Sequence, residues 1–132
     1  MMHAEGGIVM KYLNLLMKLK DAGQSAERYK RELMNIAESG KSELHKTANL
    51  KAAYIRAEGE FRRLKEQAFE QIRASEDPEL MRALYQRRVY GASWDDMNRR
   101  ILSNRSEMDL RLAAYQYIKQ NYHHPEAYSD CF

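Results

Sequence analysis

The sequence predicts an all-α protein in which a long N-terminal antiparallel helical hairpin precedes a helix-turn-helix-type unit of three helices. Three observations predict this fold class. The 132 residues include only six Gly and two Pro, so helix breakers are rare. Apolar residues recur at the three- and four-residue spacing that is typical of helices. Gly40, Pro78, Gly91 and Pro125 divide the chain into segments of helical length.

The overall composition argues against a disordered, a membrane-spanning and a secreted protein. Apolar residues make up 44% and charged residues 31% of the chain, which is not the composition of a disordered protein. No run of about 18 apolar residues is present, so a transmembrane helix is not expected. The first ten residues lack the pattern of a secretory signal. Cys131 is the only cysteine, so no disulfide is expected within the chain, and a cytoplasmic protein is predicted.

Residues 9–39 are predicted to form the first helix, after a loose leader. Gly23 and Ser25 weaken the middle of this segment, and we expect one kinked helix rather than two. Gly40 stands where a helix-ending glycine is expected. The apolar residues that define the helix are Leu13, Leu16 and Met17 in its first half and Ala26, Tyr29, Leu33 and Ile36 in its second half.

Residues 43–75 form the second predicted helix, with Ser42 as its N-cap. Its apolar residues alternate at spacings of four and three, as in a coiled-coil seam. One amphipathic helix cannot bury such a stripe alone, so the seam needs a partner. The first helix is the nearer candidate and gives an antiparallel hairpin, whereas a second copy of the chain gives a homodimer. The seam consists of Leu50, Tyr54, Ala57, Phe61, Leu64 and Ala68, followed after a slip by Ile72.

The third and fourth helices are predicted from their end residues. Asp77 and Pro78 fit the N-cap and first position of the third helix, and Gly91 ends it. Ser93 caps the fourth helix, and Trp94, the only tryptophan, is expected to pack in the core. The residues expected on the buried sides are Leu80, Leu84 and either Met81 or Val89 in the third helix, and Met97 and Ile101 in the fourth.

The last helix is expected over residues 104–121, with Ser103 or Asn104 as its N-cap. Its buried side is predicted to carry Met108, Leu112, Tyr115 and either Ile118 or Lys119. The chain is thus expected to contain a leader and helical hairpin over residues 1–76, a helix-turn-helix-like unit over 77–122, and an irregular tail over 123–132.

The second half has the order of a helix-turn-helix unit: helix, glycine, Ser-Trp, short helix, turn, longer helix. It resembles a family of small phage-encoded regulators, including the RinA-type late-transcription activators. In this family a helical hairpin precedes a helix-turn-helix similar to region four of bacterial sigma factors. The resemblance covers roughly residues 77–120 well and 10–75 loosely. The matching residues are Asp77, Pro78, Leu80, Leu84, Tyr90, Gly91, Ser93, Trp94, Asp95 and Asp96.

The resemblance implies a phage or prophage DNA-binding transcriptional regulator that performs no chemistry. The helix near 104–121 would enter the major groove, and the hairpin would dimerise or dock on host RNA polymerase. In this mechanism Arg87, Arg88, Arg99 and Arg100 hold phosphates, Asn104, Arg105 and Ser106 read base edges, and Arg111 completes the basic set.

An alternative interpretation stays open for the same region. Glu107 and Asp109 lie at the expected reading edge, where phosphates would repel their carboxylates. The arginines would then form a solvated rim that pairs with these acids and with Asp95 and Asp96. Under this hypothesis the chain is a phage-encoded protein-interaction module that inhibits or adapts a host nucleic-acid-handling complex, as an anti-CRISPR-like inhibitor does. The eight basic and five acidic residues over 78–121 permit DNA contact without requiring it.

No sequence motif indicates catalysis or cofactor binding. The chain lacks a glycine-rich phosphate loop, an HExxH motif and a GxSxG motif. His123, His124 and Cys131 do not have the spacing of structural zinc ligands. We therefore expect no enzymatic activity, no cofactor and no metal. The expected partners are duplex DNA, host RNA polymerase or another host protein, and a second copy of the chain, but no membrane.

Overall fold

The computed structural model describes residues 11–40, 44–100 and 105–121, and for residues 98–100 only the backbone. These residues form five helices and no strand, which confirms the all-α class. The helices are α1 (Tyr12–Ser39), α2 (Leu44–Ala74), α3 (Pro78–Tyr90), α4 (Trp94–Arg100) and α5 (Glu107–Asn121).

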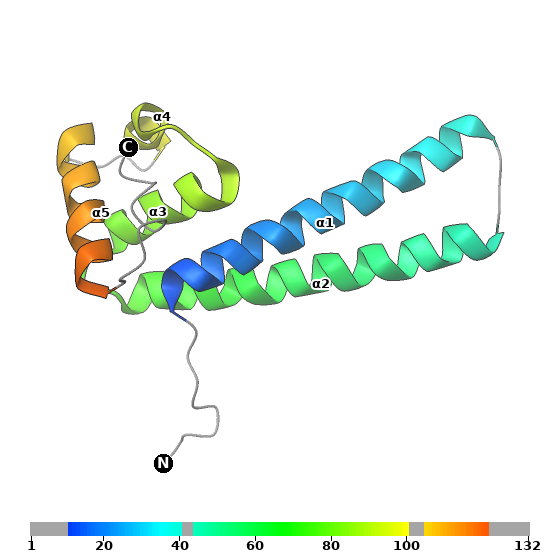
Figure 1. Ribbon diagram of the computed structural model, residues 1–132, viewed down its shortest axis with the longest axis horizontal. Helices are drawn as coiled ribbons and strands as arrows, with labels where there is room; N and C mark the ends of the chain where they lie inside the picture. The colour runs from blue at the N-terminus through cyan, green and yellow to red at the C-terminus, as the bar shows by residue number, and fades with distance from the viewer. Residues whose placement is uncertain (1–10, 41–43, 101–104, 122–132) are drawn as a thin grey trace, which may run out of the picture.

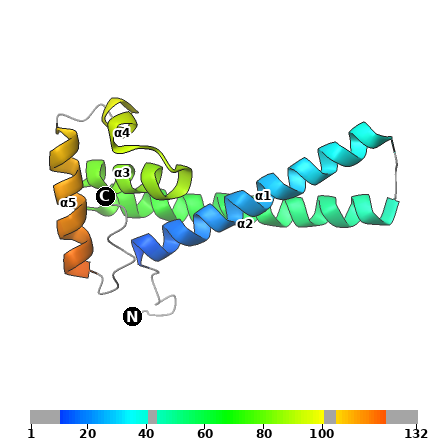
Figure 2. The ribbon, with the colours of Figure 1, turned by 45° about the horizontal axis from the view of Figure 1, so that its top comes forward.

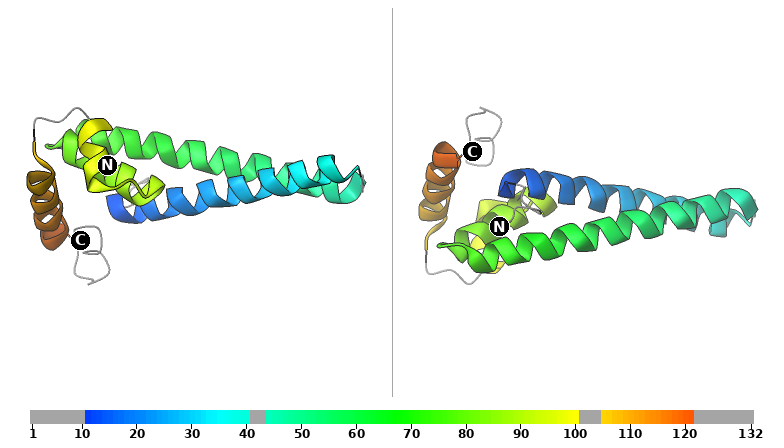
Figure 3. Two further views of the ribbon diagram at one scale, coloured as in Figure 1. Left: turned by 90° about the horizontal axis from the view of Figure 1, so that it is seen from above. Right: turned by 90° about the horizontal axis from the view of Figure 1, so that it is seen from below.

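The molecule has an elongated part and a compact part (Figure 1). Helices α1 and α2 lie side by side and antiparallel as a long hairpin, whereas α3, α4 and α5 gather at the end where α1 begins and α2 ends (Figure 2). Helix α5 lies across this end, away from the tip of the hairpin (Figure 3). The arrangement confirms the predicted hairpin within one chain.

Helix α1 runs without interruption through Gly23 and ends at Gly40, which has the predicted left-handed conformation with φ 69°. Gly23 is a point of close approach between the two long helices. A Cβ atom added there would lie 3.0 Å from Cε1 of Phe61 on α2. The absence of a side chain at Gly23 therefore admits the Phe61 ring between the helices.

The predicted seam of α2 faces α1. Its last three members, Leu64, Ala68 and Ile72, are buried, and its earlier members are half-buried. The buried residues of α1 lie over 12–19, at the same end of the hairpin. We call residues 12–19 and 64–72 the stem, and residues 24–39 and 44–57 the distal half. No residue of the distal half is fully buried, because two helices alone leave each other's outer sides open.

One hydrophobic core joins the stem to the three-helix unit. The Tyr12 hydroxyl at the start of α1 donates a buried hydrogen bond of 2.5 Å to the Met81 carbonyl oxygen on α3. Trp94 is 4% exposed, which confirms its predicted place in the core. The largest fully buried side chains are Leu15, Leu16, Leu19, Leu64, Leu84, Met97, Leu110 and Ile118.

Both predicted ends of α3 and the predicted start of α4 are confirmed. The Leu80 amide donates to Oδ1 of Asp77 at 3.2 Å, and Pro78 is the first residue of α3. Gly91 ends that helix with φ 68°. Two residues later, Ser93 Oγ accepts a hydrogen bond of 3.1 Å from the amide of Asp96. These local bonds satisfy amides that have no partner within their own helix.

The last helix differs from its prediction in where it begins. The two residues predicted to cap it, Ser103 and Asn104, lie outside the described residues. Ser106 Oγ accepts a 3.1 Å hydrogen bond from the Asp109 amide, so α5 begins at Glu107 rather than near 104. Ser106 and Ser103 carry the same capping hydroxyl three residues apart. The sequence alone therefore does not decide which serine is the N-cap of this helix.

The predicted buried side of α5 is confirmed for Ile118, one of the two alternatives at its last position, but it is wrong for Met108, Leu112 and Tyr115. Leu110, Ala114 and Ile118 face the core. Met108, Leu112 and Tyr115 are 66%, 56% and 39% exposed. The helix carries two apolar stripes on different sides, because the mean directions of the two sets lie about 130° apart around the helix axis. Periodicity detects both stripes but cannot say which one meets the core.

Candidate macromolecular interface

The structure places the described residues of the predicted DNA-binding set at both ends of α3 and in the first turns of α5. Arg87 and Arg88 lie in the last turn of α3, whereas Arg105 contacts the N-cap of that helix through Asp77. Ten residues separate Asp77 from Arg87, which corresponds to about 15 Å along a helix axis. Asn104 lies outside the described residues, and so do the side chains of Arg99 and Arg100, whose backbones belong to α4.

Arg105 is tied into the fold by an ion pair. Its Nη1 lies 2.8 Å from Oδ2 of Asp77, and both side chains are about one-third exposed. The hydrogen bond from this guanidinium to Asp77 raises the pKa of Arg105 above its ordinary value. Asp77 therefore caps α3 with one carboxylate oxygen and holds the segment before α5 with the other.

Other arginines of the set also contact groups of this chain. Arg87 Nη1 donates to the carbonyl oxygen of Ala92 at 3.2 Å, across the turn between α3 and α4. Arg111 Nη1 lies 3.6 Å from Oε1 of Glu107, one turn earlier on α5. A phosphate would have to replace these contacts, so each arginine would contribute less affinity than a cation without a partner.

The outer face of α5 is apolar in the middle and charged at its start. We define it by Met108, Leu112 and Tyr115, which lie within one 60° sector of the helix. Glu107 and Asp109 stand in the first turn beside it. Another side of the same helix is fixed in the core by Leu110, Ala114 and Ile118. The three exposed side chains are therefore presented on a rigid support.

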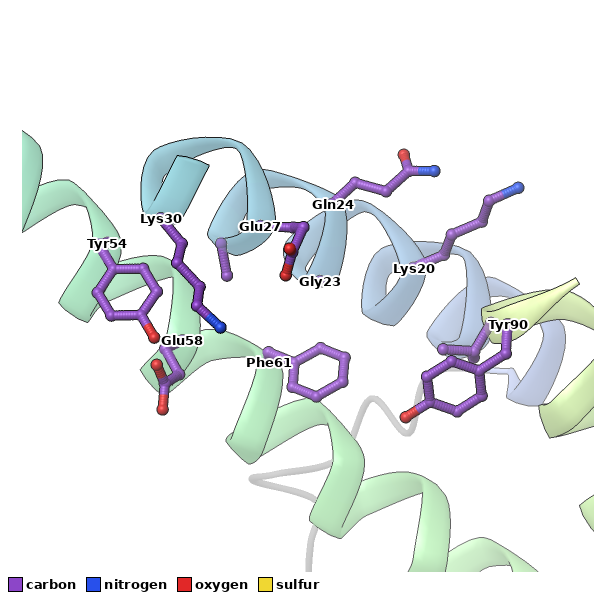
Figure 4. Close-up of a pocket in the computed structure, with 11 residues that line it drawn as sticks. Lys20, Gly23, Gln24, Glu27, Lys30, Tyr54, Glu58, Phe61 and Tyr90 are labelled. Carbon is purple, nitrogen blue, oxygen red and sulfur yellow. The ribbon is translucent and has the colours of Figure 1, made fainter. Parts of the chain in front are cut away.

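A hollow of about 380 Å³ lies between the hairpin and the end of α3. Figure 4 shows Phe61 and Tyr90 at its apolar side and Lys30 extending toward Glu58. The hydrogen bond from Tyr54 lowers the pKa of Glu58, and nearby cations including Lys30 lower it further. Carboxylates and ammonium groups occur together here, so the hollow has no preference for a ligand of one charge.

A second groove of about 470 Å³ lies between α2 and α3. Its residues are not among those predicted to bind a partner. On α2, Lys65, Phe69 and Arg73 follow each other at intervals of four, which places them on one side of the helix. This spacing was the available signal, but the residues on α3 that face them could not be found from the sequence.

Over residues 11–40, 44–100 and 105–121, no group of three or more His, Cys, Asp and Glu side chains could hold a metal ion. The same ranges contain no helix that is both long and apolar enough to cross a membrane. No family model, curated protein or solved structure matches the chain.

Proposed function

We propose that this chain is a non-enzymatic protein-interaction module that docks on a partner protein through the outer face of α5. The observation that carries the proposal is the exposed stripe of Met108, Leu112 and Tyr115 on a helix whose other side is anchored in the core. Residues at positions i, i+4 and i+7 are the anchors by which a helix binds an apolar groove.

The composition of this face favours a protein over duplex DNA. Methionine and tyrosine are enriched at protein interfaces, and apolar side chains gain about 25 cal/mol for each Å² removed from water. Met108 and Leu112 have no hydrogen-bond donor for a base edge or a phosphate. Glu107 and Asp109 would be repelled by the DNA backbone at the start of the helix.

Within the resemblance to phage regulators, the target would be a host nucleic-acid-handling complex that the module inhibits or adapts. The acids beside the apolar stripe predict a partner surface with basic residues around an apolar groove. Such a partner is typical of proteins that bind nucleic acid.

Duplex DNA is the second candidate. It is supported by the order and packing of α3, α4 and α5, and by the excess of eight basic over five acidic residues across 78–121. To bind DNA, Arg105 would have to leave its ion pair with Asp77 and contact a phosphate instead. Arg111 would leave Glu107 in the same way.

A photo-crosslinking experiment tests the first candidate. A crosslinking residue would replace Leu112 or, as a matched control, Ile55, which is also more than half exposed but lies on the distal half of α2. We expect position 112 to give a discrete protein adduct in cells that express the chain, and position 55 not to give it. A Met108→Asp change in the same chain should abolish the adduct.

A salt titration tests the second candidate. The full chain is mixed with duplex DNA at about 50 and 200 mM salt, because each phosphate contact steepens the dependence on salt. If the chain docks on a protein, we expect it to bind duplex DNA weakly or not at all. Leu112→Ser should then leave the affinity for DNA unchanged. Tight binding that Arg105→Glu and Arg111→Glu abolish, without an adduct from position 112, would overturn that proposal in favour of DNA.

A further inference from the structure

The groove between α2 and α3 is lined by aromatic and basic side chains. Lys65, Phe69, Ile72 and Arg73 come from α2, and Arg82, Tyr85, Gln86 and Tyr90 come from α3. No acidic residue is among them. This separates the groove from the hollow of Figure 4, in which Glu27 and Glu58 balance the lysines.

Three aromatic rings form a ladder along the groove. The ring centroids of Phe69 and Tyr85 are 5.5 Å apart, and those of Tyr85 and Tyr90 are 5.8 Å apart. Tyr85 is buried in the core and holds the two outer rings in place, whereas Phe69 and Tyr90 are 38% and 53% exposed. The groove therefore presents two partly exposed rings in fixed positions.

Three cations surround the ladder. Lys65 Nζ lies 5.7 Å from the centroid of Phe69. Arg73 follows one turn after Phe69 on α2, and Arg82 faces it from α3; both side chains are exposed. Among the described carboxylates, none forms an ion pair with Arg73 or Arg82. These guanidinium groups are available to an anionic ligand without the loss of an existing partner.

We propose that this groove binds single-stranded nucleic acid, with bases on Phe69 and Tyr90 and phosphates on Lys65, Arg73 and Arg82. A single strand carries flat rings and one negative charge per nucleotide, and proteins bind it with aromatic rings beside a cationic groove. In a duplex the bases are already stacked and cannot reach the rings. An acidic peptide would use the cations but would leave the ring faces without a partner.

The site is short and separate from the outer face of α5. Lys65 and Arg73 are eight residues apart, or about 12 Å along α2, so the groove accommodates a few nucleotides. The segment that leads into α5 contacts the N-cap of α3 through the Arg105–Asp77 pair, whereas Tyr90 is the last residue of α3. Occupation of the groove therefore does not depend on the function proposed for α5.

Fluorescence anisotropy with a labelled oligothymidylate of about 12 nucleotides tests the proposal on the full chain. We expect saturable binding at about 50 mM salt that weakens at about 200 mM. The double variant Arg73→Glu, Arg82→Glu should weaken binding at least about tenfold. The matched double variant Arg31→Glu, Arg56→Glu changes the net charge equally at exposed sites outside the groove, and should change the affinity by less than about twofold.

A ring variant separates base stacking from simple attraction of charge. Tyr90→Leu keeps an apolar side chain but removes the stacking surface, and should weaken binding by about fivefold or more. Circular dichroism establishes that its helical content is unchanged. If it has lost helical content, the two double arginine variants, whose side chains are exposed, decide the question alone.

Three competitors distinguish the other ligands. Duplex DNA of equal length, thymidine monophosphate and a polyglutamate peptide should each displace the labelled strand poorly. Equal competition by the duplex, by the mononucleotide or by the peptide would overturn the proposal in favour of that ligand. Equal effects of the groove and control arginine variants would overturn it too. Arg105→Glu, which tests the duplex candidate, should leave binding of the strand unchanged.

Discussion

Asp77 shows how one side chain can fix two segments that are distant in sequence. Its Oδ1 caps α3 at the Leu80 amide, and its Oδ2 holds Arg105 before α5. The cap is a local interaction that the sequence predicts. The ion pair spans 28 residues and appears only in the folded chain, so the effect of a substitution at Asp77 has a local and a tertiary part.

We expect Asp77→Ala to lower the free energy of unfolding by about 1–2 kcal/mol, since an N-cap contributes about 1 kcal/mol and a partly exposed ion pair less than that. Asp77→Asn keeps a capping oxygen and should cost less than about 1 kcal/mol. Urea unfolding measures both, with Asp21→Asn, an exposed site on α1, as the control. Equal losses for the two variants would contradict a separate contribution from the cap.

Tyr85 links stability to alkaline pH. Burial and the neighbouring Tyr90 hydroxyl raise the pKa of Tyr85 above the ordinary value of about 10. The folded chain therefore favours the neutral phenol more than the unfolded chain does. This contribution to the free energy of unfolding is fully present below about pH 10, and it decreases as the pH rises from there toward the folded pKa.

The measurement is urea unfolding at about pH 8 and about pH 11 for the wild type and Tyr85→Phe. We expect the wild type to lose more of its free energy of unfolding between these two values, because phenylalanine cannot ionise. The assignment fails if Tyr85→Phe declines with pH as steeply as the wild type.

At the scale of the helices, the two glycines inside α1 and α2 have different roles. Gly23 faces Phe61, where an added Cβ would lie 3.0 Å from the ring, whereas nothing lies within 4 Å of a Cβ added at Gly59. Glycine costs roughly 0.5–1 kcal/mol relative to alanine inside a helix. Only at Gly23 does packing between the helices explain the glycine.

Gly59→Ala should therefore raise the free energy of unfolding by about 0.5–1 kcal/mol. Gly23→Ala makes the same change in helix propensity but forces the Phe61 ring to move, so it should stabilise less or destabilise. Thermal or urea unfolding of the two variants side by side provides the test. A Gly23→Ala variant that matched Gly59→Ala would show that the close approach has no energetic effect.

At the scale of the whole molecule, the distal half of the hairpin and the stem differ in stability. The core lies in the stem and the three-helix unit, and the distal half has no fully buried residue. Segments with few buried apolar contacts open at lower free energy than the core does. We expect the distal half of the hairpin to open while the stem stays folded.

Native-state hydrogen exchange checks this expectation. Amides over residues 24–39 and 44–57 should exchange well before those over 12–19 and 64–72. The exchange should not depend on protein concentration if the chain is monomeric. Protection of the distal half that increases with protein concentration would instead indicate that a second copy of the chain covers it. That result would support the homodimer, the alternative partner considered for the seam of α2.

Features set by a few neighbouring residues followed from the sequence alone. Both ends of α3 and the start of α4 are determined by Asp77, Gly91 and Ser93, whose hydrogen bonds or φ angles depend on the nearest few residues. The seam of α2 follows from its spacing, since any partner must meet the same side of the helix. Local chemistry was enough for these features because each involves only one helix or one turn.

Features that join distant helices were decided by the tertiary structure. α5 has two apolar stripes, and the core selects Leu110, Ala114 and Ile118 only because α3 and α4 meet that side. The exposure of Met108 and Leu112, the Arg105–Asp77 pair and the aromatic ladder between α2 and α3 arise in the same way. Helical periodicity fixes the directions of side chains around one axis, but not which neighbouring helix lies in each direction.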